Sequence, residues 1–259
     1  MAGASFTIRS RLASGGTFVF PWVGMAGVTQ IAQIARMGFD AVAIDLQHGM
    51  VGEGDAPAMV AAVTAAGLPT VIRARWNMPG LVGFAYDMGA AAVIAPMVNS
   101  VAEAKALVRA AKYPPLGQRS WGGYAMVQTA GVSAAQYLRD ANAETLVFAM
   151  IETKEALAAV DDIAAVKGLD GLFVGPSDLT IALTDGESLD RSGAGTIAAM
   201  RRVAEVCKAH GLIAGAFAGT PDFCRAYAAL GFRFMAGPTD TDLLTRGAEA
   251  FLRAAAAAN

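Results

Sequence analysis

The chain has 259 residues, of which 55% are hydrophobic and only 16% charged, a composition too apolar for an intrinsically disordered protein. Its formal net charge is −2 and it has no basic block or stripe, so nucleic acid is not an expected partner. A membrane anchor is not expected either, because the cleanest apolar run, Gly89–Val98, is far shorter than the roughly 20 residues that a spanning helix needs. The first residues lack the ordered basic, apolar and cleavage regions of a signal peptide, which predicts a cytoplasmic protein.

Short runs of β-forming residues alternate with longer alanine-rich stretches of helical spacing, which is the pattern of a parallel sheet with crossover helices. The predicted strands are Thr17–Val23, Ala41–Leu46, Thr70–Ala74, Ala92–Met97, Leu146–Ile151, Gly171–Val174, Ile213–Phe217 and Phe232–Ala236. The runs are largely apolar, which indicates strands buried on both faces. Eight such units in a chain of this length predict an α/β protein, a (β/α)8 TIM barrel built as one domain over residues 1–259. A doubly wound open sheet is the alternative.

Glycines and irregular segments divide the predicted elements. Four glycines each follow a helical pattern and are expected to end a helix in the left-handed conformation: Gly38, Gly67, Gly89 and Gly231. Tyr113–Asn142 is predicted to be a loop insertion with a short helix, and Thr184–Gly195 an irregular stretch after the sixth strand. Cys207 and Cys224 have neither the number nor the spacing of a disulfide framework or a zinc site, so we expect buried free thiols.

In a barrel of this kind, catalytic groups come from the carboxyl ends of the strands and from the loops that follow them. The polar or aromatic residues at these places are few: Trp22, Asp45, Gln47, His48, Arg73, Arg75, Glu152, Ser177 and Asp178. His48 is the candidate acid/base, and a polar loop residue is the alternative interpretation. The other histidine, His210, precedes Gly211 at a predicted helix end, where the helix dipole favours it.

Glu152 and Asp178 follow neighbouring predicted strands in a barrel that is otherwise poor in charge. Two converging carboxylates suit a hard divalent cation that completes its coordination with water and substrate. The alternative is structural, because Asp178 could cap the following helix and Glu152 could lie in the first turn of a helix over Thr153–Ala165.

Arg73 and Arg75 lie two positions apart and share one face if the third strand continues that far. A buried guanidinium needs an anionic partner, either a substrate or a carboxylate of the barrel. Arg73 is the stronger candidate for substrate binding because it is nearer the apolar run. The segment Gly175–Ser177 offers backbone N–H groups as a seat for a carboxylate, although Pro176 has no such donor.

Several short segments between about Gly15 and the C-terminal helix together carry a resemblance to a known protein family. They are Pro21–Gly24, Gly38–Asp40 leading to Ile44–His48, Val71–Arg73 with Trp76–Asn77, Ala95–Val98, Tyr113–Arg119, Ile151–Thr153 and Phe173–Leu179. In order and spacing they resemble the HpcH/HpaI family of class II, metal-dependent pyruvate aldolases, which includes 4-hydroxy-2-oxoheptanedioate and 2-keto-3-deoxy sugar acid aldolases.

The resemblance implies a barrel of the phosphoenolpyruvate/pyruvate superfamily that assembles as a homohexamer, a trimer of dimers, with the C-terminal helix packed on a neighbouring subunit. It implies a divalent metal ion, Mg²⁺, Mn²⁺ or Co²⁺. The implied activity is that of a carbon–carbon lyase, which reversibly cleaves 4-hydroxy-2-oxo acids to pyruvate or hydroxypyruvate and an aldehyde through a metal-stabilised enolate. The implied partners are therefore small molecules, a 2-oxo acid and an aldehyde.

The resemblance also implies roles for individual residues. The positions of the metal ligands are matched by Glu152 and Asp178. Arg73 matches the residue on the keto or enolate oxygen, and His48 matches the acid/base. Asp45 could orient this histidine, and Asp87 matches an aspartate that can pair with it in the family, also across a subunit interface. The wall and seat of the pyruvate end are matched by Trp22, Gly175, Pro176 and Ser177. Gln47 is a departure, since some relatives have glutamate there, and the change removes a negative charge beside the metal.

Three alternative functions stay open at this point. A Schiff-base aldolase needs a lysine desolvated inside the barrel. Four of the five lysines fall in helical or helix-end patterns, namely Lys105, Lys112, Lys167 and Lys208, and Lys154 falls just past the fifth predicted strand, on the helix side. A related lyase could act on a thioester or on oxaloacetate, and an inactive barrel could serve as a binding module. The aldehyde acceptor, the preferred donor and the native metal are also open.

Overall fold

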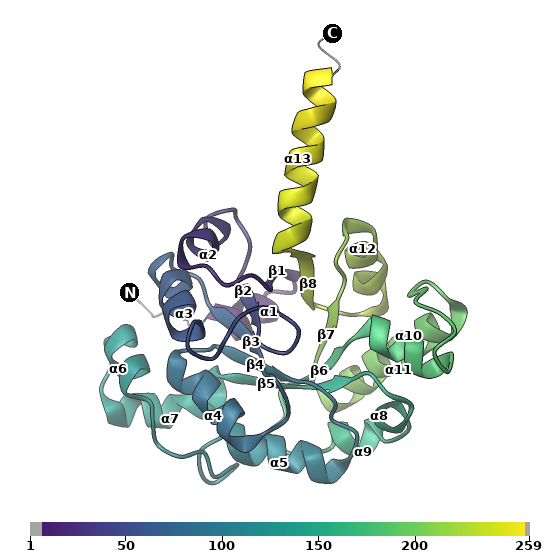
Figure 1. Cartoon of the computed structure of the whole chain (residues 1–259). Helices are drawn as coiled ribbons and strands as arrows, with labels where there is room; N and C mark the ends of the chain where they lie inside the picture. The colour runs from purple at the N-terminus through teal and green to yellow at the C-terminus, as the bar shows by residue number, and fades with distance from the viewer. Residues whose placement is uncertain (1–6, 257–259) are drawn as a thin grey trace.

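Eight parallel strands form the centre of the molecule, and each pairs with the next along the chain until β8 pairs with β1 (Figure 1). In this computed structural model, which describes residues 7–256, the strands are β1 (Phe18–Val23), β2 (Val42–Asp45), β3 (Thr70–Arg73), β4 (Ala92–Ala95), β5 (Leu146–Ile151), β6 (Gly171–Val174), β7 (Ile213–Phe217) and β8 (Phe234–Thr239). All eight predicted strands are present, and no end differs from its predicted position by more than three residues. The (β/α)8 barrel is confirmed, and the open-sheet alternative is wrong because the pairing of β1 with β8 closes the sheet.

Helices connect the strands and surround the barrel (Figure 1). They are α1 (Thr7–Ala13), α2 (Val28–Ile34), α3 (Ala56–Ala65), α4 (Pro79–Met88), α5 (Val101–Ala111), α6 (Tyr124–Ala130), α7 (Ala134–Glu144), α8 (Lys154–Ala158), α9 (Val160–Ala164), α10 (Pro176–Leu183), α11 (Ala194–His210), α12 (Pro221–Leu230) and α13 (Asp240–Ala256). All four glycines predicted to end helices have positive φ angles. At Gly89, where φ is 112°, a Cβ atom would also lie 3.0 Å from Met126 Sδ, so both conformation and packing require glycine.

The segment Tyr113–Asn142 contains more helix than the sequence analysis predicts. Two helices, α6 and α7, occupy it instead of one short helix. Gly131, whose φ is 65°, caps the end of α6. Ser133 caps the start of α7, where its hydroxyl accepts a hydrogen bond from the Gln136 backbone N–H at 3.1 Å. A left-handed glycine and a serine N-cap thus divide the segment into a helical pair.

Side chains along each strand point alternately into the barrel and out toward the helices. On β5, Phe148 and Met150 belong to the interior cluster, whereas Val147 and Ile151 pack outward. Aromatic rings fill much of the interior. Phe148 stacks on Phe234 of β8 with ring centroids 4.6 Å apart and planes 9° from parallel. The strands are therefore buried on both faces, as their apolar sequences predict.

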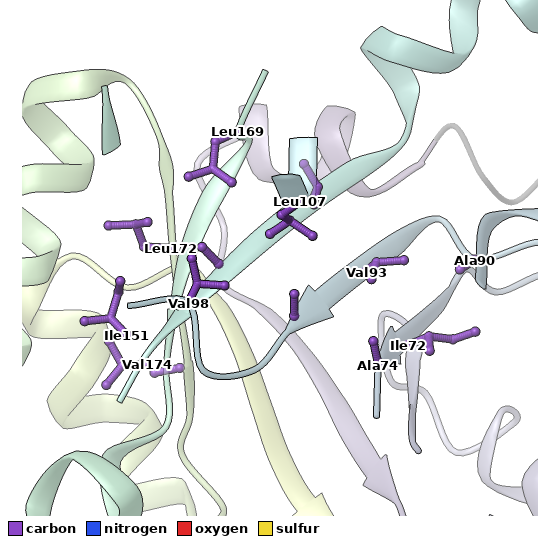
Figure 2. Close-up of a cluster of buried hydrophobic side chains, with 14 of the residues drawn as sticks. Ile72, Ala74, Ala90, Val93, Val98, Leu107, Ile151, Leu169, Leu172 and Val174 are labelled. Carbon is purple, nitrogen blue, oxygen red and sulfur yellow. The ribbon is translucent and has the colours of Figure 1, made fainter. Parts of the chain in front are cut away.

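The outer layer between strands and helices is mainly aliphatic. Figure 2 shows part of it, where strand residues such as Ile72 and Val93 lie in the same cluster as Leu107 of α5. Burial of such side chains is the main favourable contribution to folding, at about 25 cal/mol for each Å² of apolar surface removed from water. The barrel is thus held between two apolar layers, and polar side chains concentrate at its ends.

A buried lysine closes the amino end of the barrel. Lys112 is 1% exposed, and its ammonium donates hydrogen bonds to the carbonyl oxygens of Asn142 and Thr145 at 3.0 and 2.6 Å. It also pairs with the Asp170 carboxylate at 2.7 Å. Burial lowers the pKa of Lys112, and the negative charge of Asp170 opposes this shift. Three acceptors match the three N–H groups of the ammonium, and this end of a barrel contributes stability rather than catalysis.

The last helix, α13, projects away from the barrel (Figure 1). Only Asp240 in its first turn is buried, and its carboxylate accepts hydrogen bonds from the backbone N–H groups of Gly24 and Met25. Three large apolar side chains farther along the helix are 62–73% exposed: Leu244, Phe251 and Leu252. Within residues 7–256 no helix is long and apolar enough to cross a membrane. The first six residues, on which the expectation about a signal peptide partly rests, lie outside the described residues.

Candidate active site

The alternation of side chains brings polar residues to the carboxyl end of the barrel interior. Asp45 ends β2 and Arg73 ends β3, each two positions after an interior residue. Glu152 and Gly175 follow β5 and β6 in the same register, two positions after an interior methionine and an interior phenylalanine. Inward positions at one end of the barrel therefore combine two carboxylates, a guanidinium and a glycine.

A cavity of about 270 Å³ opens at this end of the barrel. Its walls are formed by Trp22, Asp45, His48, Arg73, Met150, Phe173, Gly175, Pro176, Ser177, Asp178, Phe217 and Thr239. Eight of the residues that the sequence singles out are in this wall. Glu152 is buried next to it, whereas Gln47 and Asp87 line neither this cavity nor the second one beside it.

Asp45 and Arg73 form a bidentate ion pair. Arg73 donates from Nε to Asp45 Oδ1 at 2.8 Å and from Nη2 to Oδ2 at 2.6 Å. Burial alone would raise the pKa of Asp45, but the hydrogen bonds and charge of Arg73, together with the backbone N–H groups of Gln47 and His48, hold this pKa below its ordinary value. The Arg73 guanidinium also lies 4.9 Å from the centroid of the Trp22 ring. Arg73 is therefore both ion-paired and fixed in the cavity wall, with Nη1 free of Asp45.

Glu152 is a buried carboxylate beside this pair. It is 3% exposed, and its Oε1 accepts a hydrogen bond from the Met97 backbone N–H at 2.7 Å. Met97 has a φ of 55°, which is rare for a residue other than glycine. Burial is the main cause that raises the pKa of Glu152 to about 7; the charge of Asp178 acts in the same direction, while the Met97 hydrogen bond and the charge of Arg73 oppose the shift. A cation beside Glu152 would relieve this unfavourable burial of charge.

Glu152 and Asp178 face the same small space beside Gly175. A Cβ atom at Gly175 would lie 2.7 Å from Glu152 Oε2, 3.0 Å from Met150 Cε and 3.5 Å from Asp178 Oδ2. The glycine thus leaves open a space toward which both carboxylates point.

The helix-capping alternatives for these two carboxylates are wrong. The cap of α8 is Thr153, whose hydroxyl accepts a hydrogen bond from the backbone of that helix, so Glu152 precedes the helix. The residue before α10 is Gly175, and Asp178 lies inside the helix without a capping hydrogen bond.

No group of three or more His, Cys, Asp or Glu side chains that could hold a metal occurs in the described part of the chain. Two oxygen donors fit a hard divalent ion that takes its other ligands from water and substrate.

The segment predicted to seat a carboxylate forms the start of α10. Gly175 precedes the helix, Pro176 is its first residue and Ser177 its second, and all three line the cavity. The first backbone N–H groups of a helix have no partner within it, and the helix dipole favours an anion there. Ser177 and Asp178 therefore offer N–H donors beside the two carboxylates.

An aromatic wall bounds the cavity on the side of β1, β6 and β7. Trp22 stacks on Phe173 with centroids 5.8 Å apart and meets the edge of Phe217 at 5.7 Å. The sequence analysis singles out Trp22 but not Phe173, Phe217 or Met150 of this cavity. The alternation within the predicted strands could have found Met150 and Phe173, but strands buried on both faces do not reveal which face is inward.

His48 lies at the rim with an exposed side chain. The backbone N–H of His48 donates a hydrogen bond to Asp45 Oδ1 at 3.3 Å. The imidazole makes no hydrogen bond with the residues that the structure describes. Its neighbour Gln47 is half-buried, and the Oε1 atom of that side chain is buried without a hydrogen-bond partner in the same set of residues. The imidazole is therefore accessible to a substrate or to another chain.

Asp87 lies on α4, in the outer ring of helices, and not with His48 in the cavity of its own chain. Its Oδ1 accepts a hydrogen bond from Arg119 Nη2 at 2.7 Å. Arg119 is 5% exposed, and its guanidinium lies 4.9 and 4.7 Å from the ring centroids of Tyr86 and Tyr113. The Asp87 side chain keeps 34% of its surface exposed, so Arg119 holds the Asp87 carboxylate on the outside of the barrel.

No lysine lines either cavity. Lys154 begins α8, has a largely exposed side chain and pairs with Asp185. Lys112 is buried, but at the amino end of the strands, opposite the cavity. Within the described residues the cavity therefore lacks the desolvated lysine that Schiff-base chemistry needs.

The chain is similar to known proteins over most of its length. The family model described as HpcH/HpaI aldolase/citrate lyase matches residues 19–246. A hydroxypyruvate/pyruvate aldolase of Rhizorhabdus wittichii is 36% identical over 88% of this chain and 89% of that protein. A 4-hydroxy-2-oxo-heptane-1,7-dioate aldolase of Klebsiella pneumoniae is 31% identical over 88% of this chain and 86% of that protein.

A solved structure shows the same architecture. The HpcH/HpaI aldolase/citrate lyase family protein from Burkholderia cenocepacia J2315 superposes with a TM-score of 0.86 at 29% identity, covering 96% of this chain and 99% of that one. The match spans the whole barrel, including the strands that carry the candidate site.

Proposed function

Because the chain belongs to the HpcH/HpaI aldolase/citrate lyase family, we propose that it is a class II aldolase that reversibly cleaves 4-hydroxy-2-oxo acids. It is a carbon–carbon lyase, and the products of the proposed reaction are pyruvate or hydroxypyruvate and an aldehyde. The names of the relatives from Rhizorhabdus wittichii and Klebsiella pneumoniae support this class of substrate.

The observation that carries the proposal is the pair of carboxylates, Glu152 and Asp178, that point toward the space left open by Gly175. We assign a divalent ion, Mg²⁺, Mn²⁺ or Co²⁺, to these two ligands. When bound, such an ion supplies Lewis-acid stabilisation of the negative charge that develops on the 2-oxo acid as its carbon–carbon bond breaks.

The other residues of the cavity bind and orient the 2-oxo acid. Asp45 fixes the plane of the Arg73 guanidinium through two hydrogen bonds, so the positive charge is in place before the enolate oxygen develops its negative charge. The N–H groups at the start of α10 hold the substrate carboxylate, and Trp22 shields Arg73 and the substrate from water.

His48 serves as the acid/base in this proposal. In the cleavage direction its imidazole takes the proton from the C4 hydroxyl, directly or through a water, and returns it in synthesis. The Asp87 of the same chain is held by Arg119 on the outer surface, away from His48. We therefore propose that the Asp87 of a neighbouring subunit orients the His48 imidazole. The neutral Gln47 next to it leaves the metal site with one negative charge fewer than a glutamate would give.

The projecting α13 supports assembly into a homohexamer, a trimer of dimers. The helix projects away from its own barrel (Figure 1). Its apolar surface consists of three exposed side chains, Leu244, Phe251 and Leu252. Soluble proteins seldom leave such a surface open, and a neighbouring subunit of the same kind can bury it symmetrically.

Charged substitutions on α13 test this assembly. Phe251→Asp combined with Leu252→Asp is expected to shift the mass measured by light scattering from a hexamer to a smaller species, because two carboxylates cannot be buried without partners. Arg246→Asp, on an exposed residue of the same helix, is the control and should leave the mass unchanged. A monomeric unsubstituted protein would contradict the proposed assembly.

A side chain at position 175 is expected to disturb the metal site. Gly175→Ala should lower the turnover number at least about tenfold, because its Cβ would displace the Glu152 carboxylate. The backbone there has a φ of −89°, so alanine adds no backbone strain. Gly195→Ala has nothing within 4 Å of the added Cβ and serves as the control. Equal turnover numbers for the two variants would remove position 175 from the site.

The proposed activity is tested by measuring pyruvate or hydroxypyruvate release from a panel of 4-hydroxy-2-oxo acids, repeated with Mg²⁺, Mn²⁺ and Co²⁺. We expect release from at least one acid, together with metal-dependent decarboxylation of oxaloacetate, which passes through the same enolate. No reaction with any acid and any of the three metals would favour an inactive barrel that binds without catalysis.

A further inference from the structure

One cation next to the cavity is not used by the proposed mechanism. Arg191 lies in the loop between α10 and α11. Its guanidinium carbon is 4.3 Å from the centroid of the Phe223 ring and 6.0 Å from that of Phe217, which is itself part of the cavity wall. A hydrogen bond of 3.3 Å from Nη1 to the carbonyl oxygen of Ala218 ties it to the end of β7. Arg191 is therefore held at the carboxyl end of β7, beside a ring of the cavity wall, although it does not itself line the cavity.

Arg191 has no carboxylate partner in the part of the chain that the structure describes, unlike the other arginines near the site. Arg73 is paired with Asp45, and Arg75 lies 4.0 Å from Glu53 at the rim. Arg191 is half-buried and is held by aromatic rings and one carbonyl oxygen. A guanidinium in this position keeps most of its donors for an anion from solution.

The neighbouring carboxylate in the loop is engaged elsewhere. Asp190 Oδ1 accepts hydrogen bonds from the backbone N–H of Ser192 at 2.9 Å and from the Ser192 hydroxyl. These hydrogen bonds turn the carboxylate toward Ser192 and lower the pKa of Asp190. A second contact, from the Ser188 backbone N–H to Thr184 Oγ1 at 3.1 Å, fixes the start of the loop. The loop thus presents Arg191 in a preset position, which reduces the ordering cost of binding.

We propose that Arg191 binds a carboxylate at the far end of the aldehyde acceptor and thereby selects carboxylated aldehydes over neutral ones. This inference rests on the proposed aldolase function. The pyruvate end of the substrate is assigned to Arg73 and the start of α10, so in this proposal the acceptor extends past Phe217 of the cavity wall toward Arg191, which lies beside that ring. A planar guanidinium matches a carboxylate with two parallel hydrogen bonds and stacks on aromatic rings at the same time.

The test compares acceptors in the synthesis direction, with pyruvate as donor. The probes are succinic semialdehyde, which is carboxylated, butanal, which is neutral and of equal chain length, and glyceraldehyde 3-phosphate. Arg191→Gln is expected to raise the KM for succinic semialdehyde by about 10- to 100-fold, while kcat/KM for butanal stays within about twofold. Arg225→Gln is the matched control, because it removes the same charge from an exposed residue of α12 that is paired with Asp222.

The outcomes separate this inference from the proposed function. Reaction of the unsubstituted protein with butanal supports the aldolase whatever Arg191 does, and no reaction with any of the three aldehydes would count against the aldolase itself. Equal losses for succinic semialdehyde and butanal in Arg191→Gln would indicate a structural role and overturn the inference. A loss confined to glyceraldehyde 3-phosphate would assign a phosphate to Arg191 and overturn its selection of a carboxylate.

Discussion

Replacing Glu152 with glutamine is expected to lower the turnover number by about a thousandfold without unfolding the protein. The amide keeps the shape of the side chain and can still accept the Met97 N–H hydrogen bond through its oxygen, but it removes the negative charge proposed to bind the metal. Burial already disfavours the ionised form of Glu152 and raises its pKa to about 7, so a neutral side chain should not reduce thermal stability. The measurements are kcat with the best acid of the panel and Tm.

The matched control for this substitution is Glu155→Gln. Glu155 lies three positions further along, on α8, and is exposed. Its replacement should leave both kcat and Tm unchanged. An active Glu152→Gln variant would exclude this carboxylate from the site, whereas an inactive variant with a much lower Tm would make its role structural.

The second large effect concerns the opposite end of the barrel. Lys112→Met is expected to lower the free energy of unfolding by about 3 kcal/mol, because it leaves Asp170 in a largely buried position with only Arg9 to balance its charge. The carbonyl oxygens of Asn142 and Thr145 would also lose their shared donor. For a chain of this size the loss corresponds to a fall in Tm of about 6–12 °C, which calorimetry or thermal circular dichroism can measure.

An exposed lysine on the preceding helix provides the control for this loss of stability. Lys105 of α5 is exposed, and Lys105→Met should change the free energy of unfolding by no more than about 0.5 kcal/mol. Well below its Tm, the Lys112→Met variant should keep its kcat, because Lys112 lies far from the cavity. Equal stability of the two variants would contradict the account of the amino end, and a loss of kcat at full stability would return Lys112 to the candidates for Schiff-base chemistry.

The barrel could be predicted from sequence because two local signals agree. Apolar runs such as Leu146–Ile151 mark strands buried on both faces, and glycines such as Gly89 mark the helix ends between them. The same pattern places Asp45, Arg73 and Glu152 at strand ends, where parallel strands bring them to one edge. The positions of the strand ends in the sequence were therefore enough to predict which residues form most of the candidate site.

Other features depend on contacts that a linear pattern does not contain. Met97 donates its N–H to Glu152 and has a positive φ, which is imposed by the surrounding fold and not by the residue type. The hydrogen bond from Arg119 to Asp87 joins α4 to a loop 32 residues further along the chain. Arg191 had no sequence signal because its position depends on the rings of Phe217 and Phe223.

In the proposed mechanism, a metal ion bound by Glu152 and Asp178, and not a lysine, supports the chemistry. The most direct measurement is pyruvate release after removal of metal with EDTA, followed by addition of Mg²⁺, Mn²⁺ or Co²⁺ and by a parallel treatment with borohydride in the presence of pyruvate. We expect loss of activity with EDTA, recovery with at least one metal, and no covalent trapping of pyruvate. Full activity after chelation, together with borohydride trapping of pyruvate on a lysine, would contradict the proposed mechanism.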